Sequence, residues 1–246
     1  MDRMIYVAMT GAKHAAERQA TIAHNLANAT TTGYRADVNA FRAVYVKGHG
    51  LETRAFVIES TTGSDFAPGP VQQTGRDLDV AVQGKGWIAV QLDDGSEAYT
   101  RNGSLQINAN GLLQTRGGFS VAGDSGPISI PQDTQPVIGR DGTISAVPFG
   151  TKPNTVSTIG RIKLVNPEES QLTKGPDGLF RLKGGGQAEA DAAVGVISGA
   201  LEGSNVNVVE AMVGMIETAR QYEMQMQLLQ KAEQNASQAT QILSVR

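Results

Sequence analysis

The sequence predicts an α+β fold in which long terminal helices flank an inserted antiparallel β-domain. All nine prolines lie between Pro68 and Pro176, and 26 of the 29 glycines lie between Gly48 and Gly203, so helix breakers are rare at both ends. Apolar residues recur at heptad spacing in both end segments, and turn dipeptides recur between them. These observations divide the chain into an N-terminal helix with its following segment (1–45), an extended linker (46–74), an antiparallel β-domain (75–200) and a C-terminal coiled-coil helix (201–246).

The N-terminal helix is predicted from positions spaced alternately by three and four residues. Seven of the eight positions in this stripe, which runs from Met1 to Leu26, are apolar, and several are alanine. Small side chains allow a partner helix to approach closely, so we expect this stripe to pair with the C-terminal helix.

The C-terminal helix carries a longer stripe of the same kind. Nine of its eleven positions between Val208 and Leu243 are apolar, and Ser204 is the predicted N-cap. We expect the two helices to form an antiparallel coiled-coil pair. The alternative is that both stripes face a globular core, but the turn-rich middle leaves little core for them. Neighbouring copies are therefore expected to bury the stripes, and in a single chain we expect some of these side chains to be exposed: Met212, Met215, Met226 and Leu243.

The middle segment contains repeated signals for β-hairpins. Type I′ turns favour the dipeptides Asp94-Gly95, Asn102-Gly103, Asn110-Gly111, Asp141-Gly142 and Asp177-Gly178. Apolar residues alternate or cluster between these dipeptides at 78–82, 87–91, 104–107 and 161–165, which indicates short antiparallel strands.

The overall composition argues against several classes of partner. The formal net charge is −3 and the pI is about 5.7, so no basic face for nucleic acid is expected. The chain has no cysteine, which suits export between redox compartments. No apolar run reaches the roughly 18 residues of a membrane span, and the N-terminus is read as mature protein because its apolar period continues past any signal-peptide cleavage point.

No residue pattern indicates catalysis. His14, His24 and His49 have no partner at a metal or triad spacing. Gly84-Lys85-Gly86 lacks the rest of a phosphate loop and is read as a turn. The carboxylate pairs Asp77 with Asp79 and Asp93 with Asp94 are read as solvated. We therefore predict no catalytic residue, metal or cofactor.

Three sequence blocks resemble one known family. Residues 23–28 (Ala-His-Asn-Leu-Ala-Asn) followed by Thr32-Gly33-Tyr34-Arg35 are similar to the N-terminal signature of the flagellar rod and hook proteins. Residues 201–207 with Glu210 and Arg220-Gln221-Tyr222-Glu223 resemble the C-terminal signature of the same proteins. Residues 78–87, 99–103 and 110–113 resemble their shared β-domain, so the resemblance covers most of the chain.

Within this family, the first twelve residues look most like the proximal rod protein, and the distal rod protein is the alternative. The resemblance implies a structural subunit that polymerises with copies of itself and neighbouring rod subunits. The product would be the hollow drive shaft that crosses the periplasm in the basal body and transmits torque to the hook. It also implies export by the flagellar type III secretion apparatus without a cleaved signal peptide.

The stripes and the signatures together give the expected assembly residues: Ile5, Ala12, Ile22, Asn25, Leu26, Asn28, Thr32, Gly33, Tyr34, Ser204, Asn205, Val206, Asn207, Val208, Met212, Met215, Ala219, Arg220, Tyr222, Glu223, Met226, Leu229 and Leu243. An apolar cluster of Phe41, Val44 and Tyr45 is a candidate for recognition by the export apparatus, or else packs on the β-domain. Two rival functions stay open at this point: a secreted protein whose β-domain binds or cleaves cell-wall glycan, and a soluble parallel dimer of long helices.

The assembly hypothesis predicts that the terminal segments are mobile in a monomer, because neither helix can bury its stripe alone. Amide hydrogen exchange should show fast exchange in residues 1–30 and 206–246 and slow exchange in the β-domain. Strong protection of both ends in a demonstrably monomeric sample would contradict it.

Overall fold

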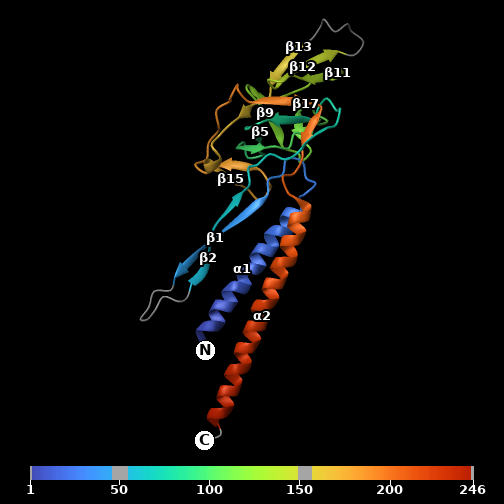
Figure 1. Ribbon diagram of the computed structural model, residues 1–246. Coiled ribbons are helices and arrows are strands. Elements are labelled where there is room, and N and C mark those ends of the chain that lie inside the picture. Colours follow the sequence, from blue (N-terminus) through green and yellow to red (C-terminus); the bar gives the residue numbers. More distant parts are fainter. Residues whose placement is uncertain (1, 46–54, 149–156, 245–246) are drawn as a thin grey trace. The chain divides into compact units, whose positions relative to one another are not determined.

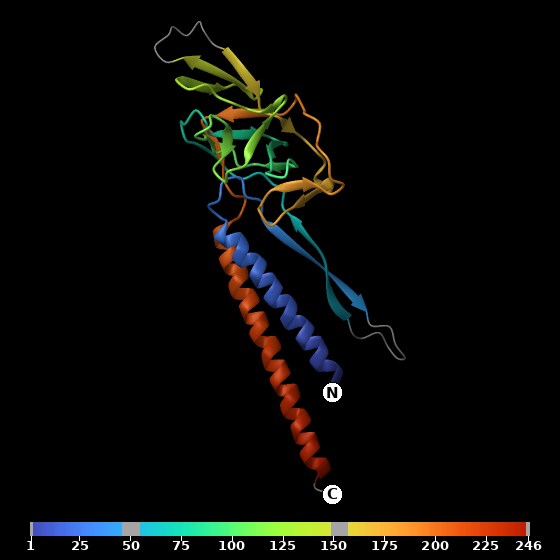
Figure 2. The same ribbon diagram turned by 180° about the vertical axis from the view of Figure 1, so that it is seen from behind.

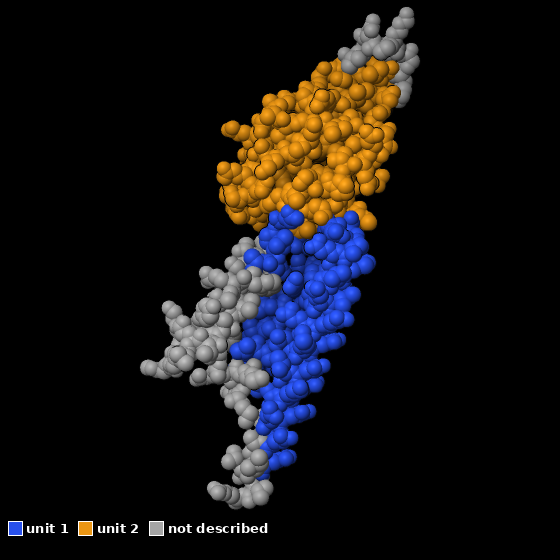
Figure 3. Space-filling model, in the orientation of Figure 1, with its two compact units in different colours: residues 1–29, 37–65, 206–246 blue, residues 30–36, 66–205 orange. Residues whose placement is uncertain are grey.

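The computed structural model describes residues 2–45, 55–148 and 157–244 (Figure 1). It contains two long helices and antiparallel strands, which confirms the α+β class. The chain divides into two compact units (Figure 3). We call residues 1–29, 37–65 and 206–246 the helical unit, and residues 30–36 and 66–205 the β unit.

The helical unit contains α1 (Asp2–Ala27) and α2 (Val208–Ser244), which lie side by side and run in opposite directions (Figures 1 and 2). Gly11 lies against Gln225, and Ile22 lies against Gly214. Residue numbers therefore rise along α1 where they fall along α2, which is the antiparallel arrangement. Alanines dominate the contact face of α1, where Ala8, Ala12 and Ala15 are buried.

An asparagine caps one end of each helix: Asn28 at the C-terminal end of α1 and Asn207 at the N-terminal end of α2. At the end of α1, the backbone N–H of Asn28 donates to His24 O at 3.2 Å and its side-chain Nδ2 donates to the same oxygen at 2.9 Å. At the start of α2, Asn207 Oδ1 accepts from the backbone N–H groups of Val209 (3.1 Å) and Glu210 (3.3 Å), which is N-cap geometry.

The predicted N-cap Ser204 is therefore wrong. The helix begins after Asn207 because residues 200–202 are still paired as a strand of the β unit, and Ser204 is buried in that unit.

The helical unit also contains an antiparallel strand pair, β1 (Asp37–Tyr45) with β2 (Ala55–Ser64). The register shifts between Ala40 and Phe41, where a β-bulge interrupts the ladder. Residues 55–64, which the sequence assigned to an extended linker, thus form a strand with one bulge.

All pairings between named strands in the described part of the β unit are antiparallel. The largest sheet comprises, in pairing order, β15 (Leu172–Lys174), β16 (Phe180–Leu182), β6 (Glu97–Thr100), β5 (Trp87–Gln91), β9 (Ser120–Gly123), β8 (Leu113–Thr115) and β7 (Leu105–Ile107), with β10 (Gly126–Pro127) beside β9 and β14 (Leu164–Val165) beside β5. A second sheet comprises β11 (Thr134–Ile138), β12 (Thr143–Pro148) and β13 (Ser157–Arg161). The smaller elements are the pair β17 (Gly195–Ser198) with β4 (Val80–Gln83), the pair β18 (Ala200–Glu202) with β3 (Val71–Gln73), and the 3₁₀ turn η1 (Glu169–Gln171).

The β unit has its own core. Aliphatic side chains from several sheets are fully buried together, among them Val80, Ile88, Leu113, Ile144 and Val196. A second cluster is aromatic: the ring centres of Trp87 and Phe180 lie 4.6 Å apart, and Phe66 and Trp87 form a T-shaped pair with ring centres 6.0 Å apart. The β unit therefore buries an aliphatic and an aromatic cluster of its own.

Four of the five predicted turn dipeptides each connect two directly paired antiparallel strands. The glycine of each of these four has positive φ: Gly95, Gly111, Gly142 and Gly178. Asn102-Gly103 is the exception and does not form a hairpin, because it joins β6 to β7, which pair with other strands. Gly103 is needed for a different reason. A Cβ at this position would lie far inside van der Waals contact with the carbonyl group of Val80.

Gly103→Ala should therefore destabilise the β unit by about 2 to 3 kcal/mol, because backbone must move to admit the methyl group. Urea unfolding followed by Trp87 fluorescence would measure this change. Gly160→Ala is the matched control, since a Cβ there meets nothing within 4 Å. It should change stability by no more than about 1 kcal/mol. Equal stability of the two variants would contradict the close approach of Gly103 to Val80.

Candidate functional site

Three segments that are distant in the sequence meet at one buried carboxylate in the β unit. Arg35 Nη2 donates to Glu202 Oε1 at 2.6 Å, and Arg101 Nη1 donates to Glu202 Oε2 at 3.0 Å. The side chains of Arg35, Glu202 and Arg101 are only 0%, 2% and 5% exposed. We call these three residues the ion-pair network.

Arg101 also holds the turn that follows β4. Its Nη1 donates to Val82 O at 3.2 Å, and its Nη2 donates to Gly84 O at 2.6 Å. Burial lowers the pKa of Arg101, while the negative charge of Glu202 opposes that shift. Arginine side chains are not deprotonated in proteins, so Arg101 remains a cation beside Glu202. In the Gly84-Lys85-Gly86 turn, the backbone carbonyl of Gly84 thus accepts a hydrogen bond from Arg101.

The charges of the network do not balance. Two guanidinium groups share one carboxylate, and within the described part of the chain Arg35 Nε, Arg35 Nη1 and Arg101 Nε are buried without a hydrogen-bond partner. A buried cation that loses its counter-charge is strongly unfavourable. Glu202 is therefore the group on which the folding of this region depends.

Backbone contacts reinforce the network. Gly33 N donates to Glu202 O at 2.8 Å, and Gly69 N donates to Glu202 Oε1 at 3.1 Å. Gly33 has φ +68°, and a Cβ there would overlap the backbone of Arg101 and Asn102. Only glycine satisfies both conditions at position 33.

Asn205 links the two segments that enter and leave the β unit. Its Oδ1 accepts from Ala36 N at 2.8 Å and its Nδ2 donates to Ala67 O at 3.1 Å. Nearby, Lys174 Nζ donates to Arg35 O at 2.8 Å and lies 3.9 Å from the centre of the Tyr34 ring. The signature residues Gly33, Tyr34 and Asn205 thus hold backbone together in this region.

Asn25 plays a corresponding part in the helical unit. Its Nδ2 donates to Asp37 O at 2.9 Å, and its Oδ1 accepts from Asp37 N at 2.8 Å. His24 Nδ1 lies 2.9 Å from Asp37 Oδ2, and Asn39 Nδ2 donates to Thr21 Oγ1 at 2.7 Å. These bonds fasten the start of β1 to α1.

The stripe predicted on α1 faces α2: Ala12 is buried, and Ile5, Ile22 and Leu26 are half-buried. On α2 the face toward α1 lies one residue before the predicted stripe. It is made of Ala211, Gly214, Thr218, Gln225 and Ala232. Small residues on α2 permit close approach to the alanines of α1. The predicted stripe differs because it follows the larger apolar side chains of α2, which lie one position further along the helix.

Most of the predicted residues on α2 are accordingly not covered by α1. Met212 is 51% exposed and Met226 is 37% exposed, in line with the expectation for a single chain, and Val208 and Tyr222 are also exposed. Met215, Ala219 and Leu229 are half-buried, while Arg220 and Glu223 are exposed. Thr32 and Val206 are half-buried. The side chains of Leu243 and of Phe41, Val44 and Tyr45 lie outside the described residues.

The ion-pair network was missed by sequence reasoning. Its members stand inside the quoted signatures, but no role was assigned to them, because 167 positions separate Arg35 from Glu202.

Asp79, expected to be solvated, is buried and accepts from Arg76 Nη1 at 3.2 Å. Within the residues described here, no group of three or more His, Asp or Glu side chains is placed to hold a metal ion, and no helix is long and apolar enough to cross a membrane.

Comparison with known proteins agrees with the three signature blocks. The family model for flagella basal body rod proteins matches residues 5–35, that for the D1 domain of flagellar hook proteins FlgE/F/G matches residues 81–146, and that for the C-terminal part of the basal body rod FlgEFG proteins matches residues 197–242. The flagellar basal-body rod protein FlgF of Escherichia coli is 49% identical over the full length of both chains. FlgF of Salmonella typhimurium is 48% identical over the same extent, and FlgF of Caulobacter vibrioides is 32% identical over 91% of this chain and 90% of its own.

The chain therefore belongs to the flagellar basal-body rod protein family. It is a structural subunit of the flagellar rod in the basal body and not an enzyme. The full-length similarity to FlgF confirms the predicted assignment to the proximal rod proteins, while the FlgG rod protein of Buchnera aphidicola (Schizaphis graminum) is 29% identical over 97% of this chain.

Glu202→Gln should destabilise the β unit by about 3 to 5 kcal/mol, because it leaves two buried guanidinium groups without a counter-charge. Urea unfolding monitored by Trp87 fluorescence would measure the change. Glu169→Gln, which breaks the exposed pair with Lys85 at 3.1 Å, is the matched control and should cost no more than about 1 kcal/mol. Similar costs for both variants would show that the network is not the dominant contact.

Proposed function

We propose that this rod subunit polymerises with copies of itself and with neighbouring rod subunits into a hollow shaft that crosses the periplasm and transmits torque to the hook. The observation that carries the proposal is the large apolar surface of α2 that α1 leaves uncovered. The family signatures at both ends of the chain support it.

The first third of α2 is apolar on more than one face. Successive residues of an α-helix are rotated by about 100°, so Val209, Val213 and Ile216 lie on the side opposite Thr218, which is buried against α1. These three side chains are 70%, 51% and 55% exposed. A helix that is apolar around its circumference is stable in water only when other surfaces bury it. Further copies of the same subunit can supply those surfaces.

The lengths of the helices support the same conclusion. The contacts of Gly11 with Gln225 and of Ile22 with Gly214 place Asp2 level with about residue 234. The last ten or so residues of α2 therefore extend about 15 Å beyond the start of α1, at 1.5 Å per residue. We infer that a helix of another subunit continues the pairing there, and that α1 and α2 form an antiparallel coiled coil within the polymer.

The other expected assembly residues divide into two groups under this proposal. Asn25, Asn28, Thr32, Gly33, Tyr34, Ser204, Asn205, Val206 and Asn207 act within the subunit by holding the chain at the ends of the helices. Val208, Arg220, Tyr222 and Glu223, which are exposed on α2, contact neighbouring subunits.

We further infer export by the flagellar secretion apparatus without a cleaved signal peptide, with recognition at Phe41, Val44 and Tyr45. These residues belong to β1, whose start is tied to α1. Secretion of a variant with all three changed to serine would test the inference. A normal secreted amount would contradict it.

Met212→Asp should abolish co-assembly with rod subunits while leaving the isolated chain folded, because this side chain is exposed in one subunit and the proposed polymer would bury the new charge. Motility and the presence of rods in purified basal bodies would be scored, with circular dichroism as the check on folding. Gln171→Asp, an exposed polar position of the β unit outside α2, is the control and should assemble normally. Normal rods built from the Met212→Asp variant would contradict the proposal.

A further inference from the structure

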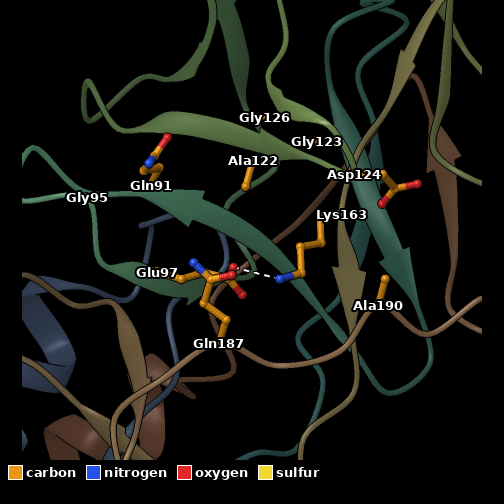
Figure 4. A pocket seen from close by; sticks show the side chains of 10 residues that line it. All are labelled: Gln91, Gly95, Glu97, Ala122, Gly123, Asp124, Gly126, Lys163, Gln187 and Ala190. Atoms are coloured by element: carbon orange, nitrogen blue, oxygen red, sulfur yellow. Dashed lines mark hydrogen bonds and ion pairs between the residues drawn. The ribbon is translucent and has the colours of Figure 1, made fainter.

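A pocket of about 380 Å³ opens in the β unit (Figure 4), and no residue of the ion-pair network lines it. Its volume lies at the small end of the range of about 300 to 1,000 Å³ that is typical of small-molecule sites. It is lined by Gln91, Gly95, Glu97, Ala122, Gly123, Asp124, Gly126, Lys163, Gln187 and Ala190.

An ion pair forms one wall of this pocket. Lys163 Nζ donates to Glu97 Oε2 at 2.7 Å, and Figure 4 shows the two side chains reaching toward each other. Their side chains are 14% and 6% exposed, and Glu97 Oε1 is buried without a hydrogen-bond partner. Such incompletely bonded buried pairs contribute little to stability. Stability alone therefore does not explain why the pair stands at a pocket.

The lining favours a polar ligand. Its apolar side chains are two alanines, and three glycines bring bare backbone to the surface. Gln91 and Gln187 each offer both donors and acceptors, Asp124 offers acceptors, and Lys163 has two N–H groups beyond the one that Glu97 receives. A hydroxyl group both donates and accepts, so a ligand with several hydroxyl groups matches this mixture.

The charges disfavour an anionic ligand, and the ion pair disfavours a cation at Glu97. Glu97 and Asp124 against Lys163 leave a net charge of −1, which repels an anion. A cation would have to approach Glu97 where the ammonium group of Lys163 already lies 2.7 Å away. A neutral ligand rich in hydroxyl groups therefore fits the ion-pair wall of the pocket better than an ion of either sign.

We propose that this pocket binds a neutral sugar of about monosaccharide size, either free or as one residue of a glycan chain. No aromatic ring lines the pocket, so binding is weak, with a Kd on the order of 1 mM. The site is separate from the helices and does not depend on the proposed assembly.

Ligand-observed saturation-transfer NMR on the full chain tests the proposal, because it detects weak binding to a protein of this size. Glucose, glucosamine and glucuronate share one ring but are neutral, cationic and anionic at pH 7. Glucose should receive the strongest saturation transfer, and glucuronate the weakest. Maltotriose added as a competitor distinguishes the sources: displacement of glucose by maltotriose at a concentration below that of the glucose indicates a glycan chain, and displacement only at an equal or higher concentration, or none, indicates a free sugar.

The decisive variant is Gln91→Ala with Gln187→Ala, since both side chains are exposed and their loss leaves the fold intact. Binding of glucose should weaken by about fivefold or more through the lost hydrogen bonds. Gln72→Ala with Gln73→Ala, which removes two exposed glutamines from β3 outside the pocket, should bind as the unaltered chain does. The proposal is overturned by absent saturation transfer to glucose, by equal transfer to glucuronate, or by equal binding in both double variants.

Discussion

The carboxylate of Glu202 is the constraint on which the β unit depends most directly. It stands between the guanidinium groups of Arg35 and Arg101, and each of its oxygens accepts from one of them. Because Arg101 also bonds Val82 O and Gly84 O, the same charge holds the end of β4 in place. One acidic side chain thus joins three segments of the chain, and the close approach it imposes explains why position 33 is glycine.

The helical unit follows a different physical rule. Its two helices meet through alanine, glycine and threonine, which allow close approach but bury little apolar area per residue. The larger side chains, such as Met212, Ile216 and Met224, remain exposed in a single subunit. The β unit carries an aliphatic and an aromatic core of its own, whereas the helical unit retains apolar surface for other subunits. This contrast is what a polymerising rod subunit requires, because folding and assembly then rest on separate surfaces.

Local sequence patterns were reliable where the physics is local. Asp94-Gly95 and Asp177-Gly178 form turns as expected, since positive φ at the glycine is a property of the turn itself. Asn102-Gly103 has the same composition but serves a contact with Val80, which no dipeptide pattern can report. The cap of α2 was misplaced for a similar reason: Ser204 is a good capping residue, yet strand pairing at Glu202 delays the helix until Asn207.

The sequence by itself determined the α+β class, the two terminal helices, most of the turns and the membership of the rod family, because periodicity, helix breakers and signature blocks are written along the chain. Only the tertiary structure decided which face of α2 meets α1, since the choice depends on the small size of Gly214 and Thr218 and not on apolar character. It also decided that Arg35 and Arg101 share Glu202, and that Lys163 meets Glu97 beside a pocket. Charges separated by many residues pair where the folded backbone brings them together, and no local pattern encodes that meeting.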